Sequence, residues 1–194
     1  ALVDAVDESI DMVFLCQPNN PTGQVAERPL MQSILDKCKA VGALLVVDEC
    51  FLDFLPDGDS FTMKSELSGA KNLFILKAFT KLYGMAGVRL GYGLCVDANL
   101  IAQMRGAGQP WAVSSLAQAA GLAALEQTEY VARVRALIEQ ERPYLENGLR
   151  SLGLRVISGK ANYLLFRAPN KLGEKMEKRG VGTFLGNLNR DIRA

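Results

Sequence analysis

The chain has 194 residues, enough for one domain with a sizeable core or for one domain and a small second one. Its hydrophobic fraction is 49%, its charged fraction is 22%, and its formal net charge is +1 with no basic stripe. These values argue against a nucleic-acid-binding or membrane-surface protein. The sequence shows no signal peptide, and its apolar runs are shorter than the roughly 20 residues of a membrane span. We therefore expect a cytoplasmic protein without membrane or nucleic-acid partners.

Histidine is absent, which excludes catalysis by Ser-His-Asp or Cys-His groups and any imidazole metal ligand. The cysteines form no CxxC pair and no spacing typical of metal ligands, so we expect no metal site. We interpret them as small buried hydrophobic residues of a reducing compartment. They are Cys16, Cys38, Cys50 and Cys95. Any chemistry must come from Lys, Asp, Glu or Tyr, or from a cofactor.

The first elements in the chain predict a βαβ unit. Apolar runs predict strands at about 11–16 and 43–48. The segment 27–41 between them predicts a helix, with Pro29 in its first turn. Because a helix connects the two strands, we expect them to run parallel.

Two further strands are predicted at 72–78 and 90–96, after a loop with a short helix near 63–67. The segment 79–89 that separates them is rich in glycine and too short for a crossover helix. We therefore expect these two strands to pair antiparallel. The sheet would then be mixed but mostly parallel.

The second half of the chain is more helical. Helices are predicted from an N-cap at Asp97 to about residue 105, from Ser114 or Ser115 to about residue 127, and over 129–152. The last of these is expected to kink at Pro143 and to bury one face. That face consists of Val131, Val134, Leu137 and Ile138.

Short strands at 154–158 and 162–167 and a charged helix at 171–179 complete the predicted elements. The predicted fold class is α/β: a mixed, mostly parallel sheet flanked by helices, followed by the start of a small α+β domain. We place residues 1–136 in the large domain and residues 137–194 in a linking helix and an incomplete small domain.

Three polar side chains follow the ends of predicted strands: Asn20, Asp48 and Lys81. Ligands of open α/β sheets bind outside the carboxyl ends of the strands, so these side chains are expected to share one site. A nucleophilic lysine and an acid that can hold a pyridinium nitrogen are what pyridoxal phosphate chemistry requires. Taken singly, the segment 18–23 could be a tight turn, Asp48 a helix cap and Lys81 a surface lysine.

The segment TKLYGMAGVRLGY at 80–92 is the most specific motif. It resembles the fold-type I, class I and II aminotransferase superfamily of pyridoxal phosphate enzymes. The resemblance implies that pyridoxal 5'-phosphate is the cofactor and that Lys81 binds it covalently and is the catalytic residue. We also count Thr80, which precedes Lys81, among the cofactor-binding residues. It also implies that Arg89 clamps the cofactor phosphate, to which its planar fork of donors is suited.

The same resemblance gives roles to three residues outside this segment. It implies that Asn20 bonds the phenolic oxygen of the cofactor and that Asp48 pairs with the ring nitrogen. Phe51 stands where many aminotransferases have a tyrosine that reaches the cofactor oxygen, and we include it among the residues that contact the cofactor. A phenyl ring cannot make that hydrogen bond, which fits a decarboxylase branch of the superfamily.

Within the superfamily the chain is most similar to the threonine-phosphate decarboxylases of cobalamin biosynthesis, which are related to histidinol-phosphate aminotransferases. The supporting segments are 15–23, 48–54, 109–114 and 160–165. The resemblance implies a lyase that converts L-threonine O-3-phosphate to (R)-1-amino-2-propanol O-2-phosphate and carbon dioxide, as a homodimer when full length. The alternatives are an aminotransferase acting on histidinol phosphate and a truncated, inactive product.

The sequence departs from the family in three places. Ala78 stands where a Ser or Thr usually bonds the phosphate. The family's amino-terminal half has no counterpart before Asp11, and the resemblance stops near Gly180. We therefore expect a fragment, and we assign Arg190 and Arg193 no role in binding a substrate carboxylate.

Overall fold

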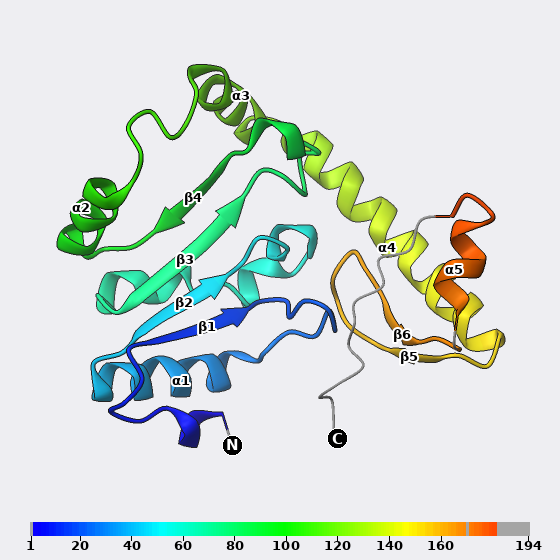
Figure 1. Ribbon diagram of the computed structural model, residues 1–194, viewed down its shortest axis with the longest axis horizontal. Helices are drawn as coiled ribbons and strands as arrows, with labels where there is room; N and C mark the ends of the chain where they lie inside the picture. Colours follow the sequence, from blue (N-terminus) through cyan, green and yellow to red (C-terminus); the bar gives the residue numbers. More distant parts are fainter. Residues whose placement is uncertain (1, 170, 182–194) are drawn as a thin grey trace.

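A four-stranded sheet lies at the centre of the computed structural model, which describes residues 2–169 and 171–181 (Figure 1). Its strands β1 to β4 lie in the order β1-β2-β3-β4. β1, β2 and β3 run parallel, and β4 pairs antiparallel with β3, so both predicted pairings are confirmed. The strands are β1 (Met12–Cys16), β2 (Leu44–Asp48), β3 (Leu73–Ala78) and β4 (Gly91–Leu94).

Helix α1 (Arg28–Val41) covers one face of this sheet. Pro29 lies in its first turn, and Gly42 ends it in the left-handed conformation at φ 80°. The buried side of α1 packs on residues of β2 and β3, and together they form the larger hydrophobic core. Its buried members include Met31, Ile34, Leu35, Cys38, Leu45, Val47, Leu73 and Ile75. We call this the covered face of the sheet.

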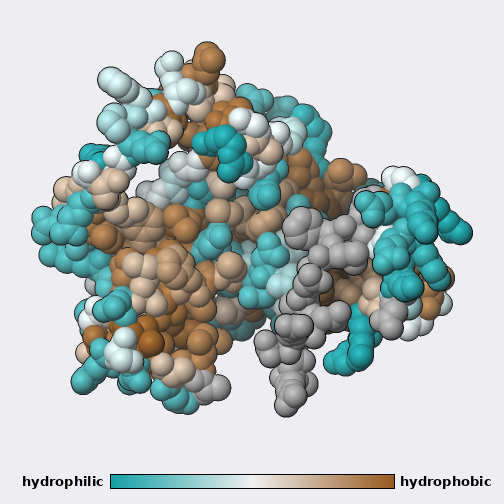
Figure 2. Space-filling view, viewed as in Figure 1, coloured by the Kyte–Doolittle hydropathy of each residue, from teal (hydrophilic) through white to brown (hydrophobic). Residues whose placement is uncertain are grey.

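The opposite face, which we call the open face, leaves apolar side chains in contact with solvent. Successive side chains of a strand point to opposite faces, so Val13 packs against the core while Phe14 points away from it and is 67% exposed. Figure 2 shows hydrophobic residues gathered over the strands of this sheet. Cys16 follows the same alternation and is exposed. The expectation that the cysteines are buried therefore holds for Cys38 and is wrong for Cys16.

The connection from β2 to β3 consists of three short 3-10 helices: η2 (Leu52–Phe54), η3 (Gly58–Ser60) and η4 (Lys64–Gly69). The short helix predicted near 63–67 corresponds to η4. This connection supplies most of a second hydrophobic core, and Leu82, which follows Lys81, also contributes to it. Its buried members are Leu52, Phe54, Leu55, Phe61 and Leu82.

The helices of the second half begin where their caps predict. The side chain of Asp97 accepts hydrogen bonds at the start of α2 (Ala98–Ala107), and Ser114 does so for α3 (Ser115–Leu125). Helix α4 (Thr128–Ser151) continues through Pro143. One residue of the face predicted to be buried, Leu137, is 57% exposed, so the prediction is wrong for that residue. The other three residues pack against the second core.

Helix α4 leads from the sheet to a separate pair of strands and a short helix (Figure 1). Strands β5 (Arg155–Ile157) and β6 (Leu165–Arg167) pair antiparallel, and α5 (Leu172–Glu177) follows them. The predicted α/β class is therefore confirmed, while the domain boundary after residue 136, which falls inside α4, stays a prediction. Among the described residues, no helix is long and apolar enough to cross a membrane.

Candidate active site

Asp48 lies at the carboxyl end of β2, directly beside Cys16 at the end of β1. Its Oδ1 accepts a hydrogen bond of 2.9 Å from the backbone N–H of Cys50, which fixes one side of the carboxylate. The side chain is half-buried. The fold thus places this carboxylate at the edge of the sheet where open α/β proteins bind ligands.

The two cysteines next to Asp48 are poor nucleophiles. Burial raises the pKa of Cys50 to about 12, and a hydrogen bond and the negative charge of Asp48 add to this effect. Burial, followed by the charge of Asp48, also raises the pKa of Cys16. The thiolate is the reactive form of cysteine, so neither residue is suited to nucleophilic catalysis at neutral pH.

Lys81 follows β3 and presents its amine to solvent beside an aromatic ring. Its Nζ lies 5.8 Å from the ring centroid of Phe51, which comes from the connection after β2. Leu82 is buried in the second core and anchors the backbone here, whereas Lys81 is exposed and Thr80 is half-buried. The structure therefore brings Lys81 close to Phe51, which follows Asp48 by three residues in the chain.

Asn20 lies in a tight turn after β1. The neighbouring Asn19 side chain accepts a 2.8 Å hydrogen bond from the Thr22 hydroxyl, and Gly23 adopts a φ of 70° that favours glycine. Asn20 itself is exposed. This turn places its carboxamide at the same end of the sheet as Asp48.

Arg89 lies in the turn that leads into β4, with φ at 57°. Its Nη1 donates a 3.0 Å hydrogen bond to the carbonyl oxygen of Ala86, and the side chain is exposed. Within the described residues, no hydrogen bond or ion pair joins Arg89 to Asp48 or Lys81. Its remaining donors point to no protein acceptor there, so the guanidinium keeps donors for a ligand.

Sequence reasoning gave no role to Tyr163, which contacts two of these segments. Its ring meets Phe51 edge-on at 5.1 Å, and its hydroxyl donates a 3.0 Å hydrogen bond to the carbonyl oxygen of Asn19. Burial raises the pKa of Tyr163 to about 12, and nearby Cys16 and Asp48 add to the effect. The signal that could have identified it is its place in the segment 160–165, which carries part of the family resemblance.

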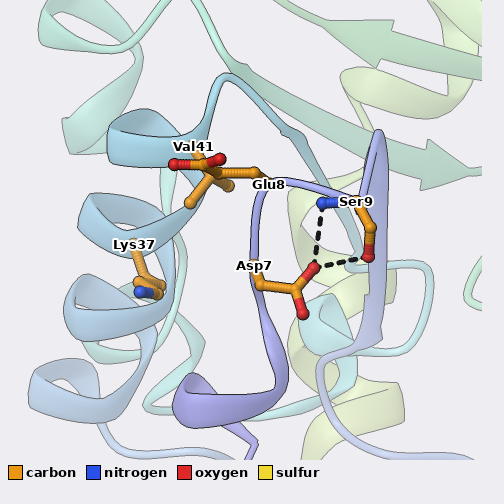
Figure 3. Close-up of a pocket in the computed structure, with 5 residues that line it drawn as sticks. All are labelled: Asp7, Glu8, Ser9, Lys37 and Val41. Carbon is orange, nitrogen blue, oxygen red and sulfur yellow. Dashed lines mark hydrogen bonds between the residues drawn. The ribbon is translucent and has the colours of Figure 1, made fainter.

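Two surface hollows are lined by other residues. One, of about 460 Å³, lies between the segment before β1 and the last turns of α1, near the amino ends of the strands (Figure 3). It is lined by Asp7, Glu8, Ser9, Lys37 and Val41. Another, of about 500 Å³, lies beside the turn after β1 and is lined by Gln24, Val25, Ser158, Gly159 and Lys160. Neither contains a predicted cofactor residue.

A family model described as aminotransferase class I and II matches residues 1–181. The chain belongs to the aminotransferase class I and II family. Enzymes of this family depend on pyridoxal 5'-phosphate. The match covers all of the described residues, and its end agrees with the end of the resemblance near Gly180.

Individual relatives carry two different activities in their names. The chain is 38% identical over 168 residues to threonine-phosphate decarboxylase of Salmonella typhimurium, a match that covers 86% of this chain and 46% of the relative. It is 37% identical over 184 residues to histidinol-phosphate aminotransferase of Symbiobacterium thermophilum, covering 93% of this chain and 50% of the relative. The chain therefore spans about half the length of these curated relatives.

Solved structures show the same fold. The crystal structure of histidinol-phosphate aminotransferase from Clostridium acetobutylicum superposes with a TM-score of 0.85 and 28% identity, covering 90% of this chain and 54% of that one. The mixed sheet with flanking helices is thus the aminotransferase fold, as the sequence predicted.

The chemical types of three residues, one at the end of β2, one after β3 and one before β4, fit the family's cofactor. The group requires an anion for its ring nitrogen, an amine for its aldehyde carbon and a cation for its phosphate. Asp48, Lys81 and Arg89 are an anion, an amine and a cation of these types, and Lys81 is exposed and lies beside the Phe51 ring. The chemistry of these residue types therefore fits the group.

Proposed function

We propose that this chain carries the cofactor-binding residues of a pyridoxal-phosphate-dependent lyase that decarboxylates L-threonine O-3-phosphate. The observation that carries the proposal is the exposed amine of Lys81 beside Phe51, at the end of the sheet that also holds Asp48. The similarity to threonine-phosphate decarboxylase supports the choice of substrate, since the match is 38% identical over 168 residues.

Each proposed residue has a role that its chemistry suits. Asp48, as a carboxylate, keeps a bound pyridine nitrogen protonated. Arg89 binds the phosphate, and Asn20 donates to the phenolic oxygen. The amine of Lys81 would hold the group at its aldehyde carbon, and Thr80 and Phe51 lie next to Lys81. The cofactor supplies a sink for the electron pair left on Cα when a bond to that carbon breaks.

The two candidate reactions differ in the bond that breaks at Cα. In decarboxylation the bond from Cα to the carboxylate breaks, carbon dioxide leaves, and a proton takes its place on Cα. In transamination the bond from Cα to hydrogen breaks instead. The Lys81 amine serves in both cases, because it delivers the proton in the first and removes it in the second.

Histidinol-phosphate aminotransfer is the second candidate. It is supported by the match to histidinol-phosphate aminotransferase, which covers 93% of this chain, whereas the match to threonine-phosphate decarboxylase covers 86%. Both candidate substrates carry a phosphate and an amine. The alternative of another class is that the chain is a truncated product with no activity by itself.

The reactions are separated by an assay with carboxyl-labelled L-threonine O-3-phosphate and pyridoxal phosphate. We expect the purified chain to release labelled carbon dioxide without any oxo acid. Turnover of histidinol phosphate that requires 2-oxoglutarate would instead support the aminotransferase. No turnover of either substrate would contradict the proposal for this chain. The Lys81→Met variant, which lacks the amine, is the control and is expected to be inactive in each assay.

A further inference from the structure

A buried cation that the proposed chemistry does not use lies behind the candidate site. Lys77 belongs to β3, the strand that leads to Lys81, and its side chain is 1% exposed. Its Nζ lies 3.1 Å from Oε2 of Glu49 and 2.8 Å from Oδ1 of Asp53. Burial acts to lower the pKa of Lys77, but the two carboxylates outweigh it and raise the pKa. The lysine is therefore a charged ammonium ion enclosed by protein.

The two carboxylates flank residues of the candidate site. Glu49 directly follows Asp48, and Asp53 lies two residues beyond Phe51. Lys77 therefore contacts both ends of the segment 49–53. Side chains alternate along extended backbone, so Glu49 reaches Lys77 on the covered face while Asp48 points to the open face.

The partners of Lys77 are themselves held in place. Glu49 is fully buried, and its oxygens accept hydrogen bonds of 2.8 Å from the Thr62 hydroxyl and from the backbone N–H of Met63. The carbonyl oxygen of Asp53 accepts a 2.9 Å hydrogen bond from Nε of Arg135 in α4. These bonds connect β3, the connection after β2, and α4 through one cluster of charges.

We propose that Lys77 is a positioning residue, which fixes the segment 48–53 so that Asp48 keeps its place at the end of β2 and Phe51 keeps its place beside Lys81. Removing one partner from a buried ion pair leaves the other charge uncompensated. Without the ammonium group of Lys77, the carboxylate of Glu49 would therefore have to move or become hydrated. Either change displaces the backbone next to Asp48. The functional meaning of this proposal rests on the proposed cofactor site, but the displacement itself does not.

Cys50 reports on this segment without any cofactor. Burial and Asp48 keep its pKa high, whereas the positive charge of Lys77 acts to lower it. Two accounts of Lys77 therefore predict opposite results for Lys77→Met. If Lys77 acts only as a charge, its loss raises the pKa of Cys50 further and slows alkylation. If it holds the segment, its loss exposes Cys50 and speeds alkylation.

The experiment measures the rate at which iodoacetamide modifies Cys50, by peptide mass spectrometry, with fully buried Cys38 as internal reference. We expect Lys77→Met to speed the reaction by about tenfold or more, since a fall of one unit in pKa raises the thiolate fraction tenfold. Lys77→Arg, which keeps a cation, is expected to react at the wild-type rate. An unchanged or slower rate in Lys77→Met would overturn the proposal.

A general loss of stability is excluded by a matched variant. Ile34→Ala truncates a buried side chain in the core on α1 and leaves the ion cluster intact. It is expected to lower the free energy of unfolding without speeding alkylation of Cys50. If Ile34→Ala and Lys77→Met accelerate the reaction equally, Lys77 has no positioning role.

The link to the cofactor is measured separately, from the dissociation constant of pyridoxal phosphate. We expect Lys77→Met to weaken the binding of pyridoxal phosphate by about tenfold, which is the effect of one misplaced hydrogen bond to a charged group. Lys77→Arg is expected to bind pyridoxal phosphate as the wild type does. If Lys77→Met speeds alkylation of Cys50 but leaves the dissociation constant unchanged, Lys77 does not support cofactor binding. A wild-type chain that does not bind the cofactor at Lys81 would contradict the proposed function, and the alkylation rates would still test whether Lys77 holds the segment.

Discussion

At the scale of single residues, the candidate site depends on neighbours that take opposite sides of one sheet. Asp48 points to the open face, whereas Glu49 is fully buried against Lys77. The sequence predicted Asp48 and Lys81 because Asp48 closes one apolar run and Lys81 follows another within a few residues, both of which are local patterns. It did not predict the contacts of Tyr163, whose hydroxyl bonds a carbonyl 144 residues away, because no local pattern encodes such a pairing.

Ala78 is the residue for which the family resemblance predicts a gain of affinity. It ends β3 and is half-buried, and its methyl group cannot donate to a phosphate. We expect Ala78→Ser to tighten binding of pyridoxal phosphate by about 1.5–3 kcal/mol, tenfold or more in Kd, because a hydrogen bond to a charged group is added. Fluorescence titration measures this constant.

The control for this prediction is Ala107→Ser, which adds a hydroxyl at an exposed position at the end of α2. It is expected to leave the dissociation constant unchanged. If Ala78→Ser also has no effect, the assignment of this position to the phosphate is wrong.

At the scale of elements, local signals predicted most strands and helices, because helix caps and apolar periodicity depend on residues that are close in the sequence. Asp97 and Ser114 begin their helices as predicted. The exposure of Leu137 was missed because it depends on what packs against α4, which periodicity does not reveal. The close contact between the turn after β1 and the segment after β5 was missed for the same reason.

That contact involves two glycines, Gly23 and Gly159, and Gly159 has no room for a side chain. A Cβ on Gly159 would lie 2.4 Å from the carbonyl carbon of Gly23, and the N–H of Lys160 donates a 2.6 Å hydrogen bond to the Gly23 oxygen. We expect Gly159→Ala to lower the free energy of unfolding by about 1–3 kcal/mol, because backbone must shift. Urea denaturation measures the change.

Gly148→Ala provides the matched comparison. Gly148 lies inside α4, and a Cβ there would meet nothing within 4 Å. Alanine is the better helix former, so this variant is expected to gain about 0.5–1 kcal/mol. Equal effects of the two substitutions would show that the contact at Gly159 does not contribute to stability.

At the scale of the whole molecule, the open face distinguishes this chain from an ordinary α/β domain. Parallel sheets are normally covered on both faces, yet Met12 and Phe14 are 46% and 67% exposed. The chain also spans about half the length of its curated relatives.

The open face predicts association in solution, because large exposed apolar patches favour contacts between molecules. We expect the purified chain to self-associate with increasing concentration, and Phe14→Ser to reduce this. Sedimentation velocity measures the effect. Leu152→Ser, which removes a 76% exposed leucine from the end of α4, is the control and should not change it. A wild-type chain that stays monomeric at all concentrations would disprove this prediction.

The central claim is that Lys81 is the residue that binds pyridoxal phosphate. It is tested most directly by incubating the purified chain with limiting pyridoxal phosphate, reducing it with borohydride and mapping the modified peptide by mass spectrometry. We predict modification concentrated on Lys81 and strongly reduced in Asp48→Asn, because loss of the carboxylate weakens cofactor binding. Modification spread evenly over exposed lysines such as Lys71 and Lys178 would contradict the account.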